Sequence, residues 1–242
     1  MSEYAIEVEN LSISYKGLKS YSIKRNFLLG QRNKPATFLA LKDISFRLEK
    51  GEILGLVGKN GSGKSTLLKA IAGIFTPDSG TVNLHGNTVT LLAIGVGFQK
   101  ELSGRENILL SGMLMGFSKK EILSKSDEII EFSELGEFID KPVSTYSSGM
   151  YSKLSFAITA ILETDIILID EVLSVGDARF KKKSYQKMKE LIGQKNRTVI
   201  IASHDRKAVA ELCDKVLWIN DSQLMQIGET AEVLRAYDAF MD

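Results

Sequence analysis

The feature that most constrains this chain is a short apolar run that leads into a glycine-rich segment. Residues 53–57 read Ile-Leu-Gly-Leu-Val, which is typical of a strand buried on both faces of a parallel sheet. Residues 58–65 follow directly as Gly-Lys-Asn-Gly-Ser-Gly-Lys-Ser, and apolar residues then recur at helical spacing. A strand, a glycine-rich turn and a helix in this order match the phosphate-binding loop, or P-loop. The sequence therefore predicts an α/β fold that binds the phosphates of a nucleotide.

Each residue type in this loop suits phosphate binding. Glycines let the backbone wrap around phosphates and point its N–H groups inward, at the positive end of the following helix. Lys64 is expected between the β- and γ-phosphates, and the Ser65 hydroxyl is expected to bind Mg²⁺. The expected nucleotide contacts are Gly58, Lys59, Asn60, Gly61, Ser62, Gly63, Lys64, Ser65 and Thr66.

A second apolar run, 166–169, ends in two carboxylates. Asp170 is expected to reach Mg²⁺ in the crevice at the carboxyl end of the strand, and Glu171 to polarise the attacking water. The alternative is a strand end that turns into solvent, where acids are common, but a P-loop upstream favours the metal site. His204 ends the strongly apolar strand 199–202 and is expected to contact the γ-phosphate, although a lone histidine after a strand is often structural.

The rest of the pattern places these segments in one α/β layout. The chain has 242 residues, enough for one large domain or two small ones. Helical patterns alternate with buried strands, which is typical of helices around a mostly parallel sheet. The expected strands include 5–15 and 40–48, residues 105–163 are expected to be mainly helical, and further helices are expected at 179–193 and 206–213.

Composition excludes several classes of protein. The single cysteine, Cys213, cannot form an internal disulfide, which fits a reducing compartment. The uncharged run 79–99 is too polar for a helix exposed to lipid, and no apolar signal segment opens the chain. A formal charge of +1 argues against a nucleic-acid coat, so we expect no nucleic-acid partner. We expect a soluble cytoplasmic protein without a membrane span.

Three further segments lie along the chain between or after the P-loop and the carboxylate pair. They are Gln99, the stretch Tyr-Ser-Ser-Gly-Met at 146–150, and Ser-Val-Gly-Asp at 174–177. Together with the P-loop, the carboxylate pair and His204, they resemble the ATP-binding subunit of ABC transporters over essentially the whole chain. On that resemblance 58–65 is the Walker A loop, 146–150 the signature and 174–177 the D-loop. Gln99 then fits the Q-loop, Asp170 and Glu171 fit Walker B, and His204 fits the switch histidine.

The resemblance implies a fold and two cofactors. It implies a P-loop NTPase cassette with a RecA-like, mostly parallel sheet core and an N-terminal antiparallel β part. The core is expected at about 1–100 and 164–242, with an inserted helical subdomain at about 101–163, all within a single nucleotide-binding domain. ATP and Mg²⁺ are the implied cofactors, and Lys64, Gln99, Glu171 and His204 the implied catalytic residues. Ser65, Gln99 and Asp170 are the implied metal ligands.

In this family two copies pair head to tail, and each signature caps the ATP held by the other copy. Ser147 is expected to cap the following helix, and Gly149 to allow close backbone approach. Ser148 and Met150 depart from the usual Leu-Ser-Gly-Gly-Gln, which puts the turnover rate in question. The implied nucleotide contacts outside the P-loop are Tyr15, Gln99, Ser147, Ser148, Gly149, Met150, Asp177 and His204. Tyr15 is expected to stack on adenine, with Tyr21 or Phe38 as alternatives.

Three departures from the common pattern bear on cargo: the signature, the segment 95–108 and an insertion at 16–38. Together they resemble the exporters of lipid-linked polysaccharides, namely teichoic acid, capsule and O-antigen. That resemblance implies a separate transmembrane permease, a second copy of the chain, a lipid-linked glycan as cargo, and a peripheral place on the cytoplasmic side of the membrane. Because the chain ends at Asp242, we expect no added carbohydrate-binding domain. An ABC transporter for another cargo is the alternative.

Two segments of the sequence each allow two interpretations of their role. The insertion 16–38 is either a solvated loop or a surface that faces anionic lipid or cargo. The apolar run 108–115 either packs in the core or forms a groove for the membrane subunit. The insertion carries six basic residues and no acid: Lys16, Lys19, Lys24, Arg25, Arg32 and Lys34.

Overall fold

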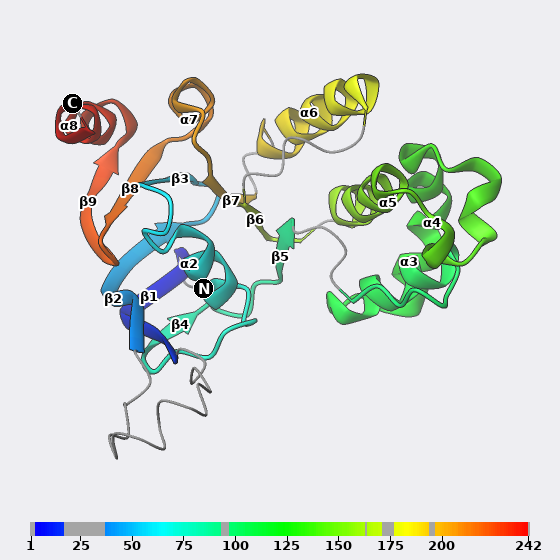
Figure 1. Cartoon of the computed structure of the whole chain (residues 1–242), viewed down its shortest axis with the longest axis horizontal. Coiled ribbons are helices and arrows are strands. Elements are labelled where there is room, and N and C mark those ends of the chain that lie inside the picture. Colours follow the sequence, from blue (N-terminus) through cyan, green and yellow to red (C-terminus); the bar gives the residue numbers. More distant parts are fainter. Residues whose placement is uncertain are drawn as a thin grey trace, which may run out of the picture.

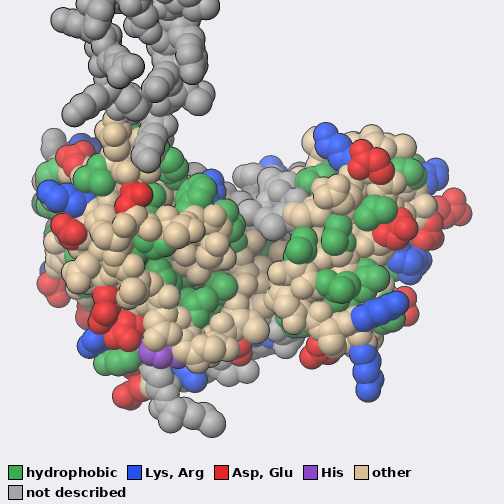
Figure 2. Space-filling model, turned by 90° about the horizontal axis from the view of Figure 1, so that it is seen from below, with side chains coloured by type: hydrophobic (Ala, Val, Ile, Leu, Met, Phe, Trp, Pro, Cys, Tyr) green, Lys and Arg blue, Asp and Glu red, His purple; other side chains and the backbone are tan. Residues whose placement is uncertain are grey.

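The computed structural model describes residues 3–16, 37–92, 97–162, 164–170, 177–193 and 197–241. Most of the basic insertion, Tyr21, Glu171 and Ser174 therefore lie outside the described residues. The chain forms a larger lobe that contains the strands and a smaller lobe of helices (Figure 1). Lysine, arginine and acidic side chains are interspersed over both lobes (Figure 2).

A six-stranded sheet forms the centre of the larger lobe. The four strands β5, β6, β7 and β3 and their neighbour β8 are parallel, and β9 closes the sheet antiparallel to β8. The prediction of a mostly parallel sheet is confirmed, and the buried apolar runs explain it because both faces are covered. In spatial order the strands are β5 (Val89–Leu92), β6 (Ile166–Asp170), β7 (Thr198–Ala202), β3 (Ile53–Val57), β8 (Lys215–Asn220) and β9 (Gln223–Glu229).

A three-stranded antiparallel sheet covers one side of this core. Its order is β2 (Thr37–Glu49), β1 (Tyr4–Lys16) and β4 (Ser79–Asn83). The inward residues of this sheet share one apolar cluster with helix α2 (Lys64–Ile71) and with β3. In the β1–β2 register Tyr15 lies opposite Phe38. Tyr15 reaches Thr66 of α2, and Phe38 lines a cavity with the first residues of that helix.

The smaller lobe has its own apolar core. Helices α3 (Gly104–Leu114), α4 (Lys119–Ser133) and α5 (Ser148–Ile161) pack around Ile108, Ile122 and Leu154. Two capping boxes, Ser103 with Glu106 and Ser118 with Glu121, begin α3 and α4. Short 3₁₀ turns at 136–140 and 143–145 lead into α5.

Three helices complete the fold. Helix α6 (Ala178–Gly193) contacts the smaller lobe, α7 (Arg206–Leu212) follows β7, and α8 (Thr230–Met241) packs on β8 and β9. The pair β8–β9 and helix α8 are additions to the elements that the sequence pattern predicted. In the described part of the chain, no helix is long and apolar enough to cross a membrane.

Candidate nucleotide-binding site

Three adjacent parallel strands end at the same edge of the sheet. Because β6, β7 and β3 are neighbours, Asp170, His204 and the P-loop come together although they are far apart in sequence. They border a cavity of about 230 Å³. Its described lining residues are Phe38, Ala40, Asn60, Gly61, Gly63, Lys64, Ser65, Thr66, Asp170, Ala202, Ser203 and His204.

The P-loop lies in close contact with β8 on one side and β2 on the other. A Cβ atom on Gly58 would overlap the carbonyl oxygen of Ile219 in β8. A Cβ atom on Gly63 would lie 2.5 Å from the carbonyl oxygen of Ala40 in β2, and Gly63 has a φ of +113°. Only glycine fits both the contact and the backbone conformation at that position. The neighbouring strands therefore hold the loop in one shape.

The positive groups of the site are Lys64 and the start of α2. Lys64 is only 8% exposed, and its Nζ atom donates to the carbonyl oxygens of Gly58 at 2.8 Å and Lys59 at 3.1 Å. Within the described structure no side-chain hydrogen bond caps α2, whose N-cap residue is Gly63. The first backbone N–H groups of such a helix form an anion-binding site. The arrangement is suited to a chain of phosphates.

Ser65 and Asp170 are the residues that fit a magnesium ion. The Ser65 Oγ atom donates to Asp170 Oδ1 at 3.0 Å, which brings the P-loop hydroxyl to the end of β6. Hydroxyl and carboxylate oxygens are ligands that Mg²⁺ prefers, and protein sites for Mg²⁺ commonly use one or two carboxylates plus substrate phosphates. No group of three or more histidine, cysteine, aspartate or glutamate side chains gathers among the described residues. The pair therefore fits a metal shared with a nucleotide.

Phe38 and Tyr15 lie differently with respect to the cavity. Phe38 lines it and is 58% exposed, which leaves the ring free to stack on a base. The Tyr15 hydroxyl is within hydrogen-bond distance of Thr66 Oγ1, at 3.1 Å, and the ring packs edge-on against Phe75. Tyr15 is absent from the described lining of the cavity. Of the aromatic residues considered from the sequence, Phe38 has the placement that suits base stacking, and Tyr21 lies outside the described residues.

His204 and Gln99 are placed on different parts of the molecule. His204 lines the cavity just after β7. The backbone of Gln99 is held from the smaller lobe: its N–H donates to Asn107 Oδ1 at 2.8 Å, and Asn107 Nδ2 donates to its carbonyl oxygen at 3.0 Å. Gln99 does not belong to the described lining of the cavity, and its predicted contacts with Mg²⁺ and water stay a prediction.

Sequence reasoning missed Asn107. This residue is completely buried on α3, and a buried amide needs hydrogen-bond partners. The signal for it was an asparagine directly before the mostly apolar helical run 108–115.

The signature residues begin a helix, as predicted. Ser147 caps α5, and its Oγ atom accepts from the backbone N–H of Met150 at 3.2 Å. Ser147 and Ser148 are exposed, and the closest described atom to a Cβ built on Gly149 is Ser147 Oγ at 3.8 Å. In the described structure these residues do not line the cavity of their own P-loop. Ser147, Ser148 and Gly149 therefore face open space, whereas Tyr146 and Met150 pack against the core of the smaller lobe.

Asp177 is engaged within its own chain. Its Oδ1 atom accepts from the backbone N–H groups of Arg179 and Phe180, both at 3.0 Å, at the start of α6. Its Oδ2 atom pairs with Lys153 Nζ on α5 at 2.8 Å. The hydrogen bond with Lys153, supported by those backbone N–H groups, lowers the pKa of Asp177 to about 2. The predicted nucleotide contact of Asp177 is not tested by this geometry.

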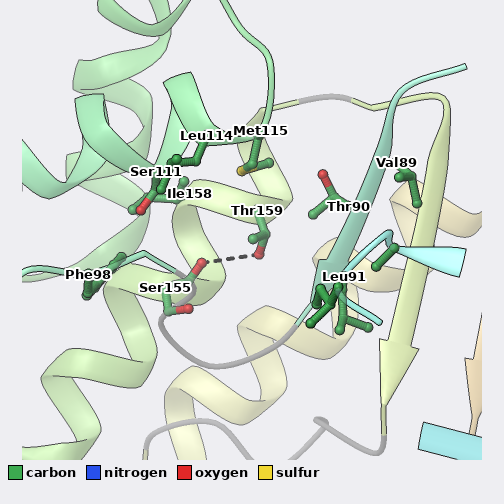
Figure 3. Close-up of a pocket in the computed structure, with 12 residues that line it drawn as sticks. Val89, Thr90, Leu91, Phe98, Ser111, Leu114, Met115, Ser155, Ile158 and Thr159 are labelled. Atoms are coloured by element: carbon green, nitrogen blue, oxygen red, sulfur yellow. Dashed lines mark hydrogen bonds between the residues drawn. The ribbon is translucent and has the colours of Figure 1, made fainter. Parts of the chain in front are cut away.

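A second cavity, of about 310 Å³, lies between β5 and the smaller lobe. Figure 3 shows β5 residues on one side and residues of α3 and α5 on the other. Leu114 is 63% exposed at this cavity, whereas Ile108 on the same helix is buried in the lobe's core. One face of the run 108–115 therefore packs in the core and another borders this cavity, and its predicted role as a groove for the membrane subunit stays a prediction. The residues labelled in Figure 3 are Val89, Thr90, Leu91, Phe98, Ser111, Leu114, Met115, Ser155, Ile158 and Thr159.

Curated relatives match most of the chain. An O-antigen export system ATP-binding protein of Klebsiella pneumoniae is 44% identical over 90% of this chain and 87% of the relative. A teichoic acids export ATP-binding protein of Staphylococcus epidermidis is 44% identical over 98% of this chain and 89% of the relative. An O-antigen export system ATP-binding protein of Myxococcus xanthus is 45% identical over 86% of this chain, which spans 47% of that relative.

Solved structures share the fold. The ATP-binding subunit of an ABC transporter matches with a TM-score of 0.74 and 21% identity, over 97% of this chain and 93% of the other. A dimeric ATP-binding cassette bound to ADP and phosphate matches with a TM-score of 0.71 and 20% identity, over 93% and 98% of the two chains. The family model of the ABC transporter matches residues 41–174, a stretch that begins in β2 and includes both the P-loop and the signature. The chain belongs to the ABC transporter family, as one of its ATP-binding cassettes.

Proposed function

We propose that this chain is the ATP-hydrolysing subunit that powers export of a lipid-linked polysaccharide of the teichoic acid, capsule or O-antigen type. The names of the relatives described above support the cargo class. The signature and the segment 95–108 led to the same class from the sequence. The alternative is an ATPase subunit for another cargo. We treat residues 1–242 as one nucleotide-binding domain, because the helices at 101–163 are inserted between strands of a single sheet.

The cavity at the sheet edge supplies the groups for ATP hydrolysis. Lys64 and the N–H groups of α2 bind the phosphates, and Ser65, Asp170 and Gln99 hold Mg²⁺. When bound, Mg²⁺ neutralises negative charge on the phosphates. Glu171 polarises the attacking water, and His204 holds the γ-phosphate and the water in place. Phe38 stacks on adenine in preference to Tyr15.

One observation carries the mechanism: the start of α2 borders the cavity at the sheet edge, whereas the start of α5 faces solvent. A helix N-terminus that carries exposed Ser147, Ser148 and open Gly149 suits an anion brought by another molecule. Two copies paired head to tail satisfy both helices, with each signature, including Met150, closing over the ATP of the other copy. ATP then stabilises the closed dimer and hydrolysis releases it.

The cavity of Figure 3 is the proposed docking site of a separate transmembrane permease. Its walls are mostly apolar, it lies beside Phe98, next to Gln99, and Leu114 on its rim is exposed. A short apolar helix of the permease fits this chemistry, and the docked subunit lies peripherally on the cytoplasmic side of the membrane. The insertion 16–38 is proposed to face the anionic membrane surface.

The dimer is tested with Glu171→Gln, which retains the shape of the side chain but removes its base. We expect this variant to form a stable dimer with ATP and Mg²⁺ in size-exclusion chromatography, and Lys64→Ala in the same background to remain monomeric. A Glu171→Gln variant that is monomeric with ATP and Mg²⁺ contradicts the mechanism.

Docking and cargo are tested in cells. The chain is co-expressed with a candidate permease, and the lipid-linked glycan that accumulates with Glu171→Gln is identified. Leu114→Glu should reduce co-purification with the permease and leave the ATP-dependent dimer intact, whereas Leu123→Glu, at an exposed leucine on α4 away from the cavity, is the matched control. Accumulation of an unrelated cargo favours the alternative function.

Membrane contact of the insertion is tested separately. Neutralising Lys24, Arg25, Arg32 and Lys34 should weaken binding to anionic liposomes, and added salt should reduce binding of the unmodified chain, because each charge near such a surface contributes about 1 kcal/mol. Unchanged liposome binding leaves the solvated-loop interpretation.

A further inference from the structure

The last turn of helix α8 reaches the P-loop. The Nζ atom of Lys59 lies 5.2 Å from the centroid of the Phe240 ring, a distance at which a cation is attracted to the face of an aromatic ring. Lys59 is exposed and directly precedes Asn60, which lines the nucleotide cavity. Phe240 is itself 47% exposed, although it is a large apolar side chain. A residue from the far end of the chain therefore contacts the loop that is expected to bind phosphates.

The backbone of Lys59 takes part in the internal hydrogen bonds of the P-loop. Its carbonyl oxygen accepts from the backbone N–H of Ser62 at 3.1 Å. The same oxygen accepts from Lys64 Nζ, also at 3.1 Å. The side chain of Lys59 thus meets α8, while its backbone contacts the lysine that the proposed mechanism places on the phosphates. A displacement of Lys59 would change the shape of the whole loop.

Strand β8 contacts the residues that lead into this point. Val57, the last residue of β3, lies opposite Trp218 in the parallel register of β3 and β8. The next residue, Gly58, lies so close to β8 that a Cβ atom on it would overlap the carbonyl oxygen of Ile219. The residue after that is the one that meets α8. Three consecutive residues are therefore held by β8 or by the helix that packs on it.

The end of α8 is itself fixed from two sides. On β8, the Trp218 ring packs against Tyr237 and Phe240, with ring centroids 5.6 Å and 5.1 Å away. On α7, Arg206 forms an ion pair with Asp238 and lies 5.3 Å from the centroid of the Tyr237 ring. Because Trp218 and Tyr237 are buried, these contacts belong to the packed core of the larger lobe. Phe240 is therefore presented to the P-loop from a firm support.

We propose that Phe240 is a positioning residue for nucleotide binding: its ring holds the Lys59 side chain, and Lys59 holds the P-loop in the shape that receives phosphates. When Lys64 turns from the Lys59 carbonyl oxygen to the phosphates, that oxygen loses one of its two described donors, and the contact with Phe240 retains the position of Lys59. Helix α8 thus acts on the nucleotide site although none of its residues belongs to the described lining of the cavity. This inference rests on the proposed nucleotide site and is independent of the dimer and the cargo.

Substitutions on both sides of the contact test it. Phe240→Leu removes the ring, Phe240→Tyr retains it, and Lys59→Met removes the ammonium group from an exposed side chain, so the test stands even if Phe240→Leu loosens α8. Phe138→Leu is the matched control, because Phe138 is 44% exposed and carries Lys141 at 4.3 Å, in the smaller lobe. ADP affinity is measured by calorimetry, since ADP occupies the P-loop without the γ-phosphate that closes the proposed dimer.

We expect Phe240→Leu and Lys59→Met each to raise the Kd for ADP about 3-fold, the size of an exposed cation–π contact. The double variant should bind about as well as either single variant, because both changes remove one interaction. Phe240→Tyr and Phe138→Leu should stay within about 1.5-fold of the unmodified chain. Unchanged ADP affinity in Phe240→Leu overturns the proposal. Additive effects also overturn it, because they assign Lys59 to the nucleotide alone.

Fluorescence gives a second measurement, because Trp218 is the single tryptophan of the chain and packs against Phe240. ADP should change the emission of the unmodified chain with the midpoint that calorimetry gives. In Lys59→Met, which leaves the rings around Trp218 in place, the change should fall to less than half. Emission that ADP leaves unchanged in the unmodified chain, or changes equally in Lys59→Met, contradicts the coupling. An unmodified chain that binds no ADP instead overturns the proposed nucleotide site.

Discussion

The starts of α2 and α5 are similar helix N-termini, but one is enclosed by other elements and the other is exposed. Both helices begin at a glycine-containing turn and direct backbone N–H groups outward from their N-termini. The start of α2 lies between β2 and β8, so Gly58 and Gly63 have no room for a side chain. The start of α5 is capped by Ser147 and faces open space. A similar helix end is thus enclosed by neighbouring strands in one case and open to solvent in the other.

The difference separates substitutions that destabilise the fold from substitutions that weaken association with a second molecule. At the P-loop, substitutions disturb neighbouring strands, so they affect folding and ATP binding together. At the signature, a side chain added at Gly149 meets no close neighbour in the described chain, so we expect it to affect association, whereas Ser147 affects the fold through its cap on α5. Four predictions test this separation, and their expected effects decrease in order.

The largest effect is expected for Lys64→Ala. This change removes the ammonium group that compensates the negative charge of the phosphates. We therefore expect the rate of ATP hydrolysis, measured as released phosphate, to fall by about 10²–10³-fold. The matched control is Lys59→Ala, on the exposed part of the same loop, which should reduce the rate far less. Retention of most of the activity in Lys64→Ala would remove the P-loop from the mechanism.

Gly63→Ala and Gly149→Ala compare the two helix starts directly. Gly63→Ala places a Cβ atom 2.5 Å from the Ala40 carbonyl oxygen at a φ of +113°, so unfolding should become easier by about 2–4 kcal/mol. Gly149→Ala should leave the denaturation midpoint unchanged and weaken the ATP-dependent dimer of Glu171→Gln. Equal destabilisation by both changes would contradict the contrast between an enclosed loop and an open one.

Phe38→Ala tests how the enclosed site recognises a base. The loss of one stacking ring should raise KM for ATP about 5–10-fold, with little change in kcat, because an aromatic stacking contact contributes about 0.5–1.5 kcal/mol. Tyr15→Phe, which removes only the hydroxyl beside Thr66, should change KM less than about 2-fold. A larger effect from Tyr15→Ala than from Phe38→Ala would assign stacking to Tyr15.

The smallest effect is expected for Ser147→Ala in the isolated chain. Loss of the cap on α5 should destabilise the fold by about 1 kcal/mol, which lowers the melting temperature by about 2–4 °C. Ser148→Ala, one residue later and without the capping role, is the control. A fall of the size expected for Gly63→Ala would show that the start of α5 is constrained by more than its cap.

Local pattern predicted the elements that carry the phosphate chemistry. The apolar run 53–57 and the glycines after it gave the strand, loop and helix because each signal is contained in about twenty consecutive residues. The capping role of Ser147 was equally local. The elements β8, β9 and α8 were harder to predict from the sequence. Strand β9 is only partly buried, and its pairing with β8 depends on tertiary contacts.

The placement of side chains from distant segments was not predictable in the same way. Phe38 reaches the cavity because β2 pairs with β1 in a particular register, and Asn107 holds the backbone of Gln99 across a turn. Asp177 pairs with Lys153 only after α5 and α6 pack together. These contacts depend on packing between elements that leave no periodic trace in the sequence.

By itself, the sequence predicted a phosphate site at the end of a buried strand, because glycines, a lysine and a serine in that spacing serve few other purposes. The tertiary structure alone decided which N-terminus is enclosed and which is open. It also decided that Ser65 and Asp170, separated by more than a hundred residues, lie within hydrogen-bond distance. The physical reason is the strand order: parallel neighbours end at one edge, and the order β6–β7–β3 is set by long-range packing of apolar faces.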